Sequence, residues 1–130
     1  MSNLILVDDD PDDQLLLEEA LHASGKTFEL LKMNNGEMLL KHLASISEDR
    51  FPFLIIMDHH MPGMEGADIL RNIKQNKKLS NIPIAIFTGS SSSTLFKELY
   101  VLGSNCVVTK PDSFTKLKDL AESLVAIFMP

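Results

Sequence analysis

The chain lacks the features of a secreted or membrane-spanning protein. Cys106 is the one cysteine among 130 residues, so no disulfide can form within the chain. No apolar run approaches the roughly 20 residues that a helix needs to cross a bilayer, and the first residues do not form a secretory signal peptide. We therefore expect a cytoplasmic protein that does not insert into a membrane.

Positive charge is also scarce. Lys and Arg together number 12 against 18 Asp and Glu, which leaves a net charge of −6. Without a basic stretch, the chain is not expected to bind nucleic acid or an anionic membrane surface. A hydrophobic content of 45% and a charged content of 23% are typical of a globular domain. A chain of 130 residues is expected to form one domain that buries roughly two-thirds of its unfolded surface.

Short apolar runs alternate with segments of helical periodicity along the chain. The runs that read as strands are 3–7, 28–33, 53–57, 82–87 and 106–108, and the helical segments are 11–24, 37–47, 66–77, 92–102 and 114–128. This alternation predicts an α/β fold, with a doubly wound five-stranded parallel sheet covered by five helices. The run 28–33 is more polar than the others, which suits an edge strand. The expected strand order is therefore the flavodoxin-like 2-1-3-4-5.

Polar residues follow four of the predicted strands. Asp8 and Asp9 end the first, Asp58 the third, Thr88 the fourth and Lys110 the fifth. The carboxyl ends of parallel strands share one edge of the sheet, called the rim below, so these side chains are expected to converge. Clustered carboxylates repel unless a cation or a proton intervenes, and hard oxygen ligands favour Mg²⁺. The pattern predicts phosphoryl transfer to a carboxylate, with Asp58 on the central strand as the nucleophile.

Four motifs together resemble the receiver domain of two-component response regulators. They are LVDDD (6–10), MDHHMPGMEG (57–66), FTGS (87–90) and VVTKP (107–111), and the resemblance covers essentially the whole chain. It implies that Asp58 accepts a phosphoryl group from a histidine kinase or a phosphotransfer protein. It also implies a site for Mg²⁺ or Mn²⁺ in which Asp58 takes part, Asp9 binds directly, Asp8 binds mainly through water, and the backbone carbonyl of His60 is a further ligand.

The resemblance also assigns roles to the other rim residues and to the whole chain. Thr88 is implied as the switch hydroxyl, Lys110 as the phosphate-binding lysine, and Pro111 as the residue after a cis peptide bond. Phosphorylation is expected to shift the loop 89–93 and the surface of the fourth helix, fifth strand and fifth helix. Residues 1–130 are expected to form a single receiver domain without an output domain. It would catalyse only its own phosphorylation and dephosphorylation, bind an unknown downstream protein, and be a monomer or a phosphorylation-dependent dimer.

Two positions depart from the family pattern. Val107 stands where an aromatic residue is usual, three positions before the lysine, and His60 is an unusual residue two positions after the aspartate. The valine leaves open a second function, a receiver-like interaction module that works without phosphorylation. The side chain of His60 is expected to face the mouth of the site, and that of His59 the opposite side of the loop.

Simpler interpretations exist for several of these residues. Asp10 is a typical helix N-cap, Pro11 suits a first helical position, and Asp12 and Asp13 complement the helix dipole. Thr88 could simply cap the turn that follows it. The two histidines could instead bind zinc or iron, although adjacent side chains rarely reach one ion. A small flavin carrier would share the fold, but carboxylates after the first strand would repel the cofactor phosphate.

Overall fold

A computed structural model describes residues 2–130, and its centre is a five-stranded parallel sheet in the order β2-β1-β3-β4-β5. The strands are β1 (Asn3–Val7), β2 (Glu29–Met33), β3 (Leu54–Asp58), β4 (Ile84–Thr88) and β5 (Cys106–Thr109). The helices are α1 (Pro11–His22), α2 (Gly36–Ser45), α3 (Gly66–Gln75), α4 (Ser93–Val101) and α5 (Phe114–Phe128), with a 3₁₀ turn at Glu48–Arg50. The predicted fold class and strand order are confirmed, and the more polar β2 lies at an edge.

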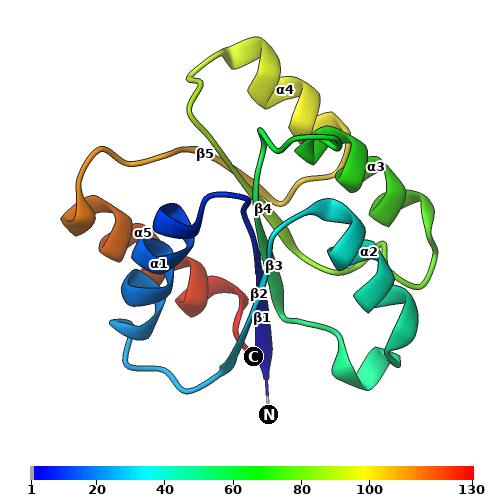
Figure 1. Cartoon of the computed structure of the whole chain (residues 1–130), viewed down its shortest axis with the longest axis horizontal. Coiled ribbons are helices and arrows are strands. Elements are labelled where there is room, and N and C mark those ends of the chain that lie inside the picture. The colour runs from blue at the N-terminus through cyan, green and yellow to red at the C-terminus, as the bar shows by residue number, and fades with distance from the viewer. Residues whose placement is uncertain (1) are drawn as a thin grey trace.

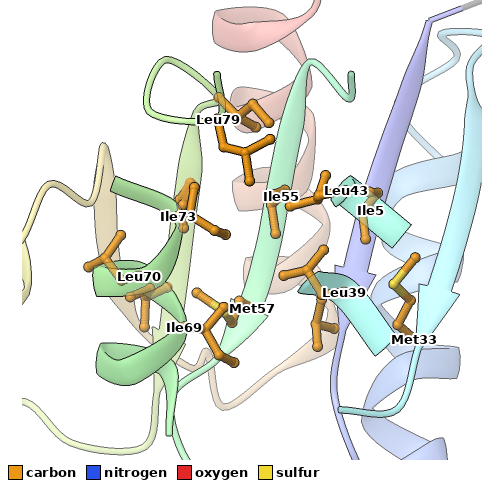
Figure 2. Close-up of a cluster of buried hydrophobic side chains, with 14 of the residues drawn as sticks. Ile5, Met33, Leu39, Leu43, Ile55, Met57, Ile69, Leu70, Ile73 and Leu79 are labelled. Carbon is orange, nitrogen blue, oxygen red and sulfur yellow. The ribbon is translucent and has the colours of Figure 1, made fainter. Parts of the chain in front are cut away.

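The helices form one layer on each side of the sheet. Figure 1 shows the sheet nearly edge-on, with α1 and α5 on one face and α2, α3 and α4 on the other. Side chains that alternate along each strand divide between two buried clusters, so that Ile5 packs beneath α2 and α3 while Leu6 packs beneath α1 and α5. Figure 2 shows the first cluster, where leucines of α2 and isoleucines of α3 meet the central strands. The three central strands β1, β3 and β4 are apolar between their end residues because both of their faces are covered, whereas the edge strand β2 carries Glu29 and Lys32.

The predicted boundaries differ from the observed ones by one or two residues: α1, α2 and α3 end two residues earlier than predicted, and β3 and β4 end one residue later. Both strands continue into their polar last residues, since Asp58 pairs with Phe87 and Thr88 pairs with Thr109 in the ladder. A prediction from hydrophobic patterning ends these two strands one residue too early, because backbone pairing does not depend on side-chain polarity. The ladder therefore holds the backbone of both rim residues rigidly.

The start of α1 agrees with the simpler interpretation of its acidic residues. The Asp10 carboxylate accepts a hydrogen bond from the backbone N–H of Asp12, and Pro11 occupies the first helical position.

The expectation of a cis peptide bond before Pro111 is wrong. No cis peptide occurs within residues 2–130, and the trans form is the lower in free energy for X–Pro bonds by about 0.5–1 kcal/mol. Within the same residues, no helix combines the length and apolar character that a transmembrane span requires.

Candidate functional site

Three carboxylates meet at the rim, where β1 and β3 end side by side. Ligand oxygens of Asp8, Asp9 and Asp58 all lie within 4.8 Å of one another, and this is the one such acidic or imidazole-containing group within residues 2–130. Asp8 and Asp58 are buried, and Asp9 is exposed. The structure thus brings together the three carboxylates that the sequence placed at the ends of two separate strands.

The burial of Asp8 has an electrostatic cost. Desolvation, joined by the nearby negative charge of Asp58, raises the pKa of the Asp8 carboxyl from 3.8 to about 6, against the opposing hydrogen bond from the Asp10 N–H and the charge of Lys110. A buried carboxylate that resists ionisation beside two others needs more positive charge than Lys110 supplies. A hard divalent cation would supply that charge and accept these oxygens as ligands, so the donor set fits a divalent metal ion.

Lys110 brings an ammonium group to the acceptor. Its Nζ lies 3.1 Å from Oδ1 of Asp58 and 3.2 Å from Oδ2 of Asp13. Burial works against the charged amine, but its hydrogen bonds and charge interactions with Asp58, Asp13 and Asp8 raise the pKa of Lys110 above its ordinary value. The ammonium is therefore charged throughout the physiological range and available to an anionic group on Asp58.

Thr88 lies on the neighbouring strand, but its hydroxyl is engaged elsewhere. The residue is completely buried, and its Oγ1 accepts a hydrogen bond of 3.1 Å from the backbone N–H of Ser90. Its carbonyl oxygen accepts a 2.7 Å hydrogen bond from the N–H of Lys110. The simpler interpretation of Thr88, a cap on the following turn, thus describes this conformation of the hydroxyl.

The loop 89–93 continues from this hydrogen bond to α4. The Ser90 hydroxyl accepts from the N–H of Ser92, and the Ser92 hydroxyl caps α4 by accepting from the N–H of Leu95. The Ser90 carbonyl also accepts a hydrogen bond from Oγ1 of Thr109 on β5. A chain of short-range hydrogen bonds therefore joins the Thr88 hydroxyl to the first turn of α4 and to β5.

The two histidines lie against each other, not on opposite sides of the loop. Their ring centroids are 4.6 Å apart in an edge-on arrangement, with His60 exposed and His59 buried. Burial, followed by the neighbouring charge of His60, lowers the pKa of His59, and its Nδ1 has no hydrogen-bond partner. Neither imidazole joins the carboxylate group, so the structure gives no support to a zinc or iron site built from them.

Three residues near the rim have contacts that the sequence did not indicate. Asp13 is a second partner of Lys110. Nε2 of Gln14 donates to the carbonyl oxygens of Asp8 and Met33, at 2.7 and 2.9 Å, and so ties the ends of β1 and β2 to α1. Tyr100 on α4 accepts the backbone N–H of Val107 at 3.1 Å through its hydroxyl oxygen. Tyr100 therefore brings an aromatic side chain from α4 into contact with position 107, although the residue at 107 is itself a buried valine.

Comparison with known proteins agrees with this fold and identifies the family. The family model described as the response regulator receiver domain matches residues 4–122. Response regulator Rcp1 of Synechocystis sp. is 32% identical over 127 residues, which cover 95% of this chain and 84% of that protein. A probable chemotaxis protein CheY of Rhizobium etli is 28% identical over 93% of this chain and 90% of its own.

Solved structures give the same result. The Mn²⁺-bound form of Rcp1 has a TM-score of 0.86 at 27% identity and covers 99% of this chain and 95% of its own. The phosphorylated cyanobacterial phytochrome response regulator RcpA has a TM-score of 0.87 at 26% identity, with 98% and 94% covered. With a family model that spans most of its length, this chain belongs to the response regulator receiver domain family.

Proposed function

We propose that Asp58 is the phosphoacceptor of this receiver domain. Receiver domains are signalling modules that interact with histidine kinases or with downstream proteins. The observation that carries the proposal is the position of Asp58, which is buried at the end of the central strand, within a cluster of carboxylates and 3.1 Å from an ammonium group. A histidine kinase or a phosphotransfer protein would supply the phosphoryl group.

The transfer forms one bond and breaks one bond. A carboxylate oxygen of Asp58 forms the new P–O bond, while the P–N bond of a phosphohistidine or the P–O bond of acetyl phosphate breaks. The electron pair of the broken bond leaves with the imidazole or the acetate. Negative charge spreads over the phosphoryl oxygens during this step, and the ammonium of Lys110 is already in place to stabilise it.

A divalent cation, Mg²⁺ or Mn²⁺, would be held by the same carboxylates. Exposed Asp9 would bind it directly, buried Asp8 mainly through water, and Asp58 and the backbone carbonyl of His60 would complete the protein ligands. Bound there, the cation would neutralise charge on the phosphoryl group. The elevated pKa of Asp8 supports the assignment, because a carboxylate that is hard to ionise alone gains most from a cation beside it.

The signal would leave the rim through Thr88. Phosphorylation adds about −1.5 to −2 charges, and the O–H donor of Thr88, which the Ser90 contact does not use, would be drawn towards that anion by turning of the side chain. Turning would withdraw the acceptor of the Ser90 N–H, which is the first hydrogen bond in the chain that leads to α4. The loop 89–93 and the surface of α4, β5 and α5 would then shift and alter the binding of a downstream protein.

A receiver-like module that works without phosphorylation is less well supported. Such a module has no need to keep three carboxylates within 4.8 Å of one another with an ammonium beside one of them, an arrangement that costs stability. A flavin carrier is also poorly supported, because these carboxylates would repel a cofactor phosphate.

Metal-dependent phosphorylation tests the proposed function. The wild-type protein, incubated with acetyl phosphate and Mg²⁺ or Mn²⁺, is expected to gain the mass of one phosphoryl group in an intact-mass spectrum. The same incubation with EDTA is expected to give no gain. Incorporation that is equal with and without the metal ion would contradict the metal site, and no incorporation under either condition would contradict the phosphoacceptor function.

Removing the Tyr100 hydroxyl tests its link to Val107. Tyr100→Phe is expected to lower the free energy of unfolding by about 1 kcal/mol, because one hydrogen bond to a strand amide is lost. Urea unfolding measures this cost. Val101→Ala is the matched control, since Val101 lies on the same helix with 86% of its surface exposed, and a change within about 0.5 kcal/mol is expected there.

Hydrogen exchange at the Val107 amide tests whether this link takes part in switching. In the wild type the amide is expected to be protected and to lose protection when beryllofluoride mimics the phosphoryl group, because α4 moves with its first turn. In Tyr100→Phe it is expected to exchange fast in both states. Protection in the wild type that does not change with beryllofluoride would exclude Tyr100 from the switch.

A further inference from the structure

The ammonium of Lys110 contacts two carboxylates that come from different parts of the fold. Asp58 ends β3, and Asp13 lies in the first turn of α1. The two Nζ–oxygen distances are nearly equal, at 3.1 Å to Asp58 and 3.2 Å to Asp13. All three residues line a cavity of about 100 Å³ beside the acceptor. Lys110 is thus held between the reacting carboxylate and a carboxylate that does not react.

The helix alone does not explain the place of Asp13. An acidic residue in a first turn stabilises a helix through the dipole, and Asp12 in the same turn already provides this. Within residues 2–130, the exposed carboxylate of Asp12 makes no hydrogen bond or ion pair, whereas that of Asp13 is bound to Lys110. Of two acidic neighbours, one therefore reaches the rim.

Phosphoryl transfer changes only one of the two contacts of Lys110. An oxygen of Asp58 becomes part of an acyl phosphate, so the carboxylate that held the ammonium is no longer the same group. Asp13 is unchanged by the reaction. Because an ammonium has three N–H donors, Lys110 can remain bound to Asp13 while it donates to a phosphoryl oxygen.

A fixed ammonium is worth more to the reaction than a free one. The long lysine side chain has many rotamers, and part of this rotamer entropy would have to be lost in the transition state if the ammonium were mobile. Groups that are positioned before the reaction stabilise the developing charge without reorganisation. Asp13 supplies such a constraint through a carboxylate oxygen 3.2 Å from the ammonium of Lys110.

We infer that Asp13 is a positioning residue for phosphoryl transfer, which holds the ammonium of Lys110 at the acceptor before, during and after the phosphorylation of Asp58. This inference rests on the proposed function. Asp13 touches neither the donor nor the phosphorus in this role, and it acts through Lys110.

If Asp13 acted through its charge alone, its removal would have the opposite effect on the phosphorylation rate. A negative charge near the acceptor repels an anionic donor such as acetyl phosphate. Its removal would then favour donor binding and accelerate phosphorylation. Removal of a positioning residue slows the transfer step instead, so the two roles predict changes of opposite sign.

The experiment measures phosphorylation rates across a range of acetyl phosphate concentrations at saturating Mg²⁺. Asp13→Asn is expected to lower the rate constant at saturating donor about three- to fivefold, consistent with a partly exposed ion pair of up to about 1 kcal/mol, and to leave the KM for the donor nearly unchanged. Asp12→Asn, which removes the same charge from the same turn, is the matched control and is expected to match the wild type. Asp13→Glu is expected to recover part of the rate.

A Lys110→Ala background tests the route of the effect. If Asp13 acts through Lys110, then Asp13→Asn is expected to cause no further loss when the lysine is absent. Urea unfolding is expected to show one cooperative transition for both variants, with Asp13→Asn less stable than Asp12→Asn by no more than its ion pair, which separates positioning from a loss of helix structure.

Three results would overturn the inference. They are a saturating rate of Asp13→Asn that equals or exceeds that of the wild type, a loss that persists at full size in the Lys110→Ala background, and an equal loss in Asp12→Asn. If the wild type is phosphorylated and any of these holds, the positioning role is wrong and the phosphoacceptor function stands. If the wild type takes up no phosphoryl group, both are wrong.

Discussion

Asp58→Asn is expected to abolish phosphoryl incorporation completely. The amide nitrogen and the un-ionised amide oxygen of asparagine are poor nucleophiles, and neither carries the negative charge that attacks phosphorus. The other rim carboxylates are not expected to replace it. Asp8 resists ionisation because it is buried, and Asp9, within residues 2–130, forms no ion pair with the ammonium that contacts Asp58.

Intact-mass spectra of both proteins after incubation with acetyl phosphate and Mg²⁺ measure this result. Borohydride converts an aspartyl phosphate into homoserine, so peptide mapping of the reduced wild type identifies the modified position. Lys110→Ala is a useful comparison, because it removes the ammonium and keeps the acceptor, and is expected to slow incorporation without preventing it. If Asp58→Asn gains as much phosphate as the wild type, the acceptor is a different residue.

The framework of the fold was predictable because it depends on periodic burial. Five apolar runs between amphipathic segments allow few arrangements other than a parallel sheet between two helical layers. The rim followed from the same pattern, since strand ends from distant parts of the chain must share one edge of such a sheet. It was therefore possible to predict without any local motif that four rim residues lie close together, namely Asp8, Asp9, Asp58 and Lys110.

Contacts between side chains of different elements were not predictable in the same way. Asp13 already had a sufficient explanation as a first-turn acid, so its contact with Lys110 left no separate trace in the sequence. Tyr100 is half exposed on α4, and nothing in helical periodicity indicates that its hydroxyl reaches the edge of β5. The side chain of His59 was placed wrongly because adjacent loop residues need not alternate in direction as strand residues do.

The orientation of the Thr88 hydroxyl is a further case. Sequence placed Thr88 at the rim, and the strand does end there. Its hydroxyl oxygen, however, accepts from the Ser90 N–H in this structure, and only a rotation of the side chain would redirect it to the rim. Local hydrogen bonding decides between these two directions, and a pattern of residue types contains no such information. The same choice is what makes the residue suitable for a switch.

Asp8→Asn is expected to stabilise the metal-free protein and to weaken its metal binding. The pKa of Asp8 rises from 3.8 to about 6 on folding, chiefly through burial, so the folded protein binds this proton more tightly than the unfolded chain. The stabilisation from that proton is complete below about pH 4 and is lost as the pH rises through about 6. Two pKa units correspond to about 3 kcal/mol, which is an upper value for the gain at pH 8.

Asparagine retains the oxygen that accepts the Asp10 N–H and removes the ionisation. The difference in unfolding free energy between Asp8→Asn and the wild type is therefore expected to be near zero at pH 4 and to reach a positive plateau above pH 7. Urea unfolding in EDTA at pH 4 to 8 measures it. Asp9→Asn is the matched control, because Asp9 is exposed and its replacement is expected to change the metal-free stability little at any pH.

Mg²⁺ is expected to reverse the order of stability. A ligand that binds the folded state alone stabilises it by RT ln(1 + [L]/Kd), and the wild type, with the complete carboxylate set, gains more than Asp8→Asn. At pH 7.5 the advantage of the variant should therefore shrink as Mg²⁺ is added and then become a disadvantage. A variant that is no more stable than the wild type in EDTA at pH 8 would show that the buried Asp8 carboxylate costs the fold nothing. An advantage that Mg²⁺ leaves unchanged would show instead that Asp8 takes no part in holding the cation.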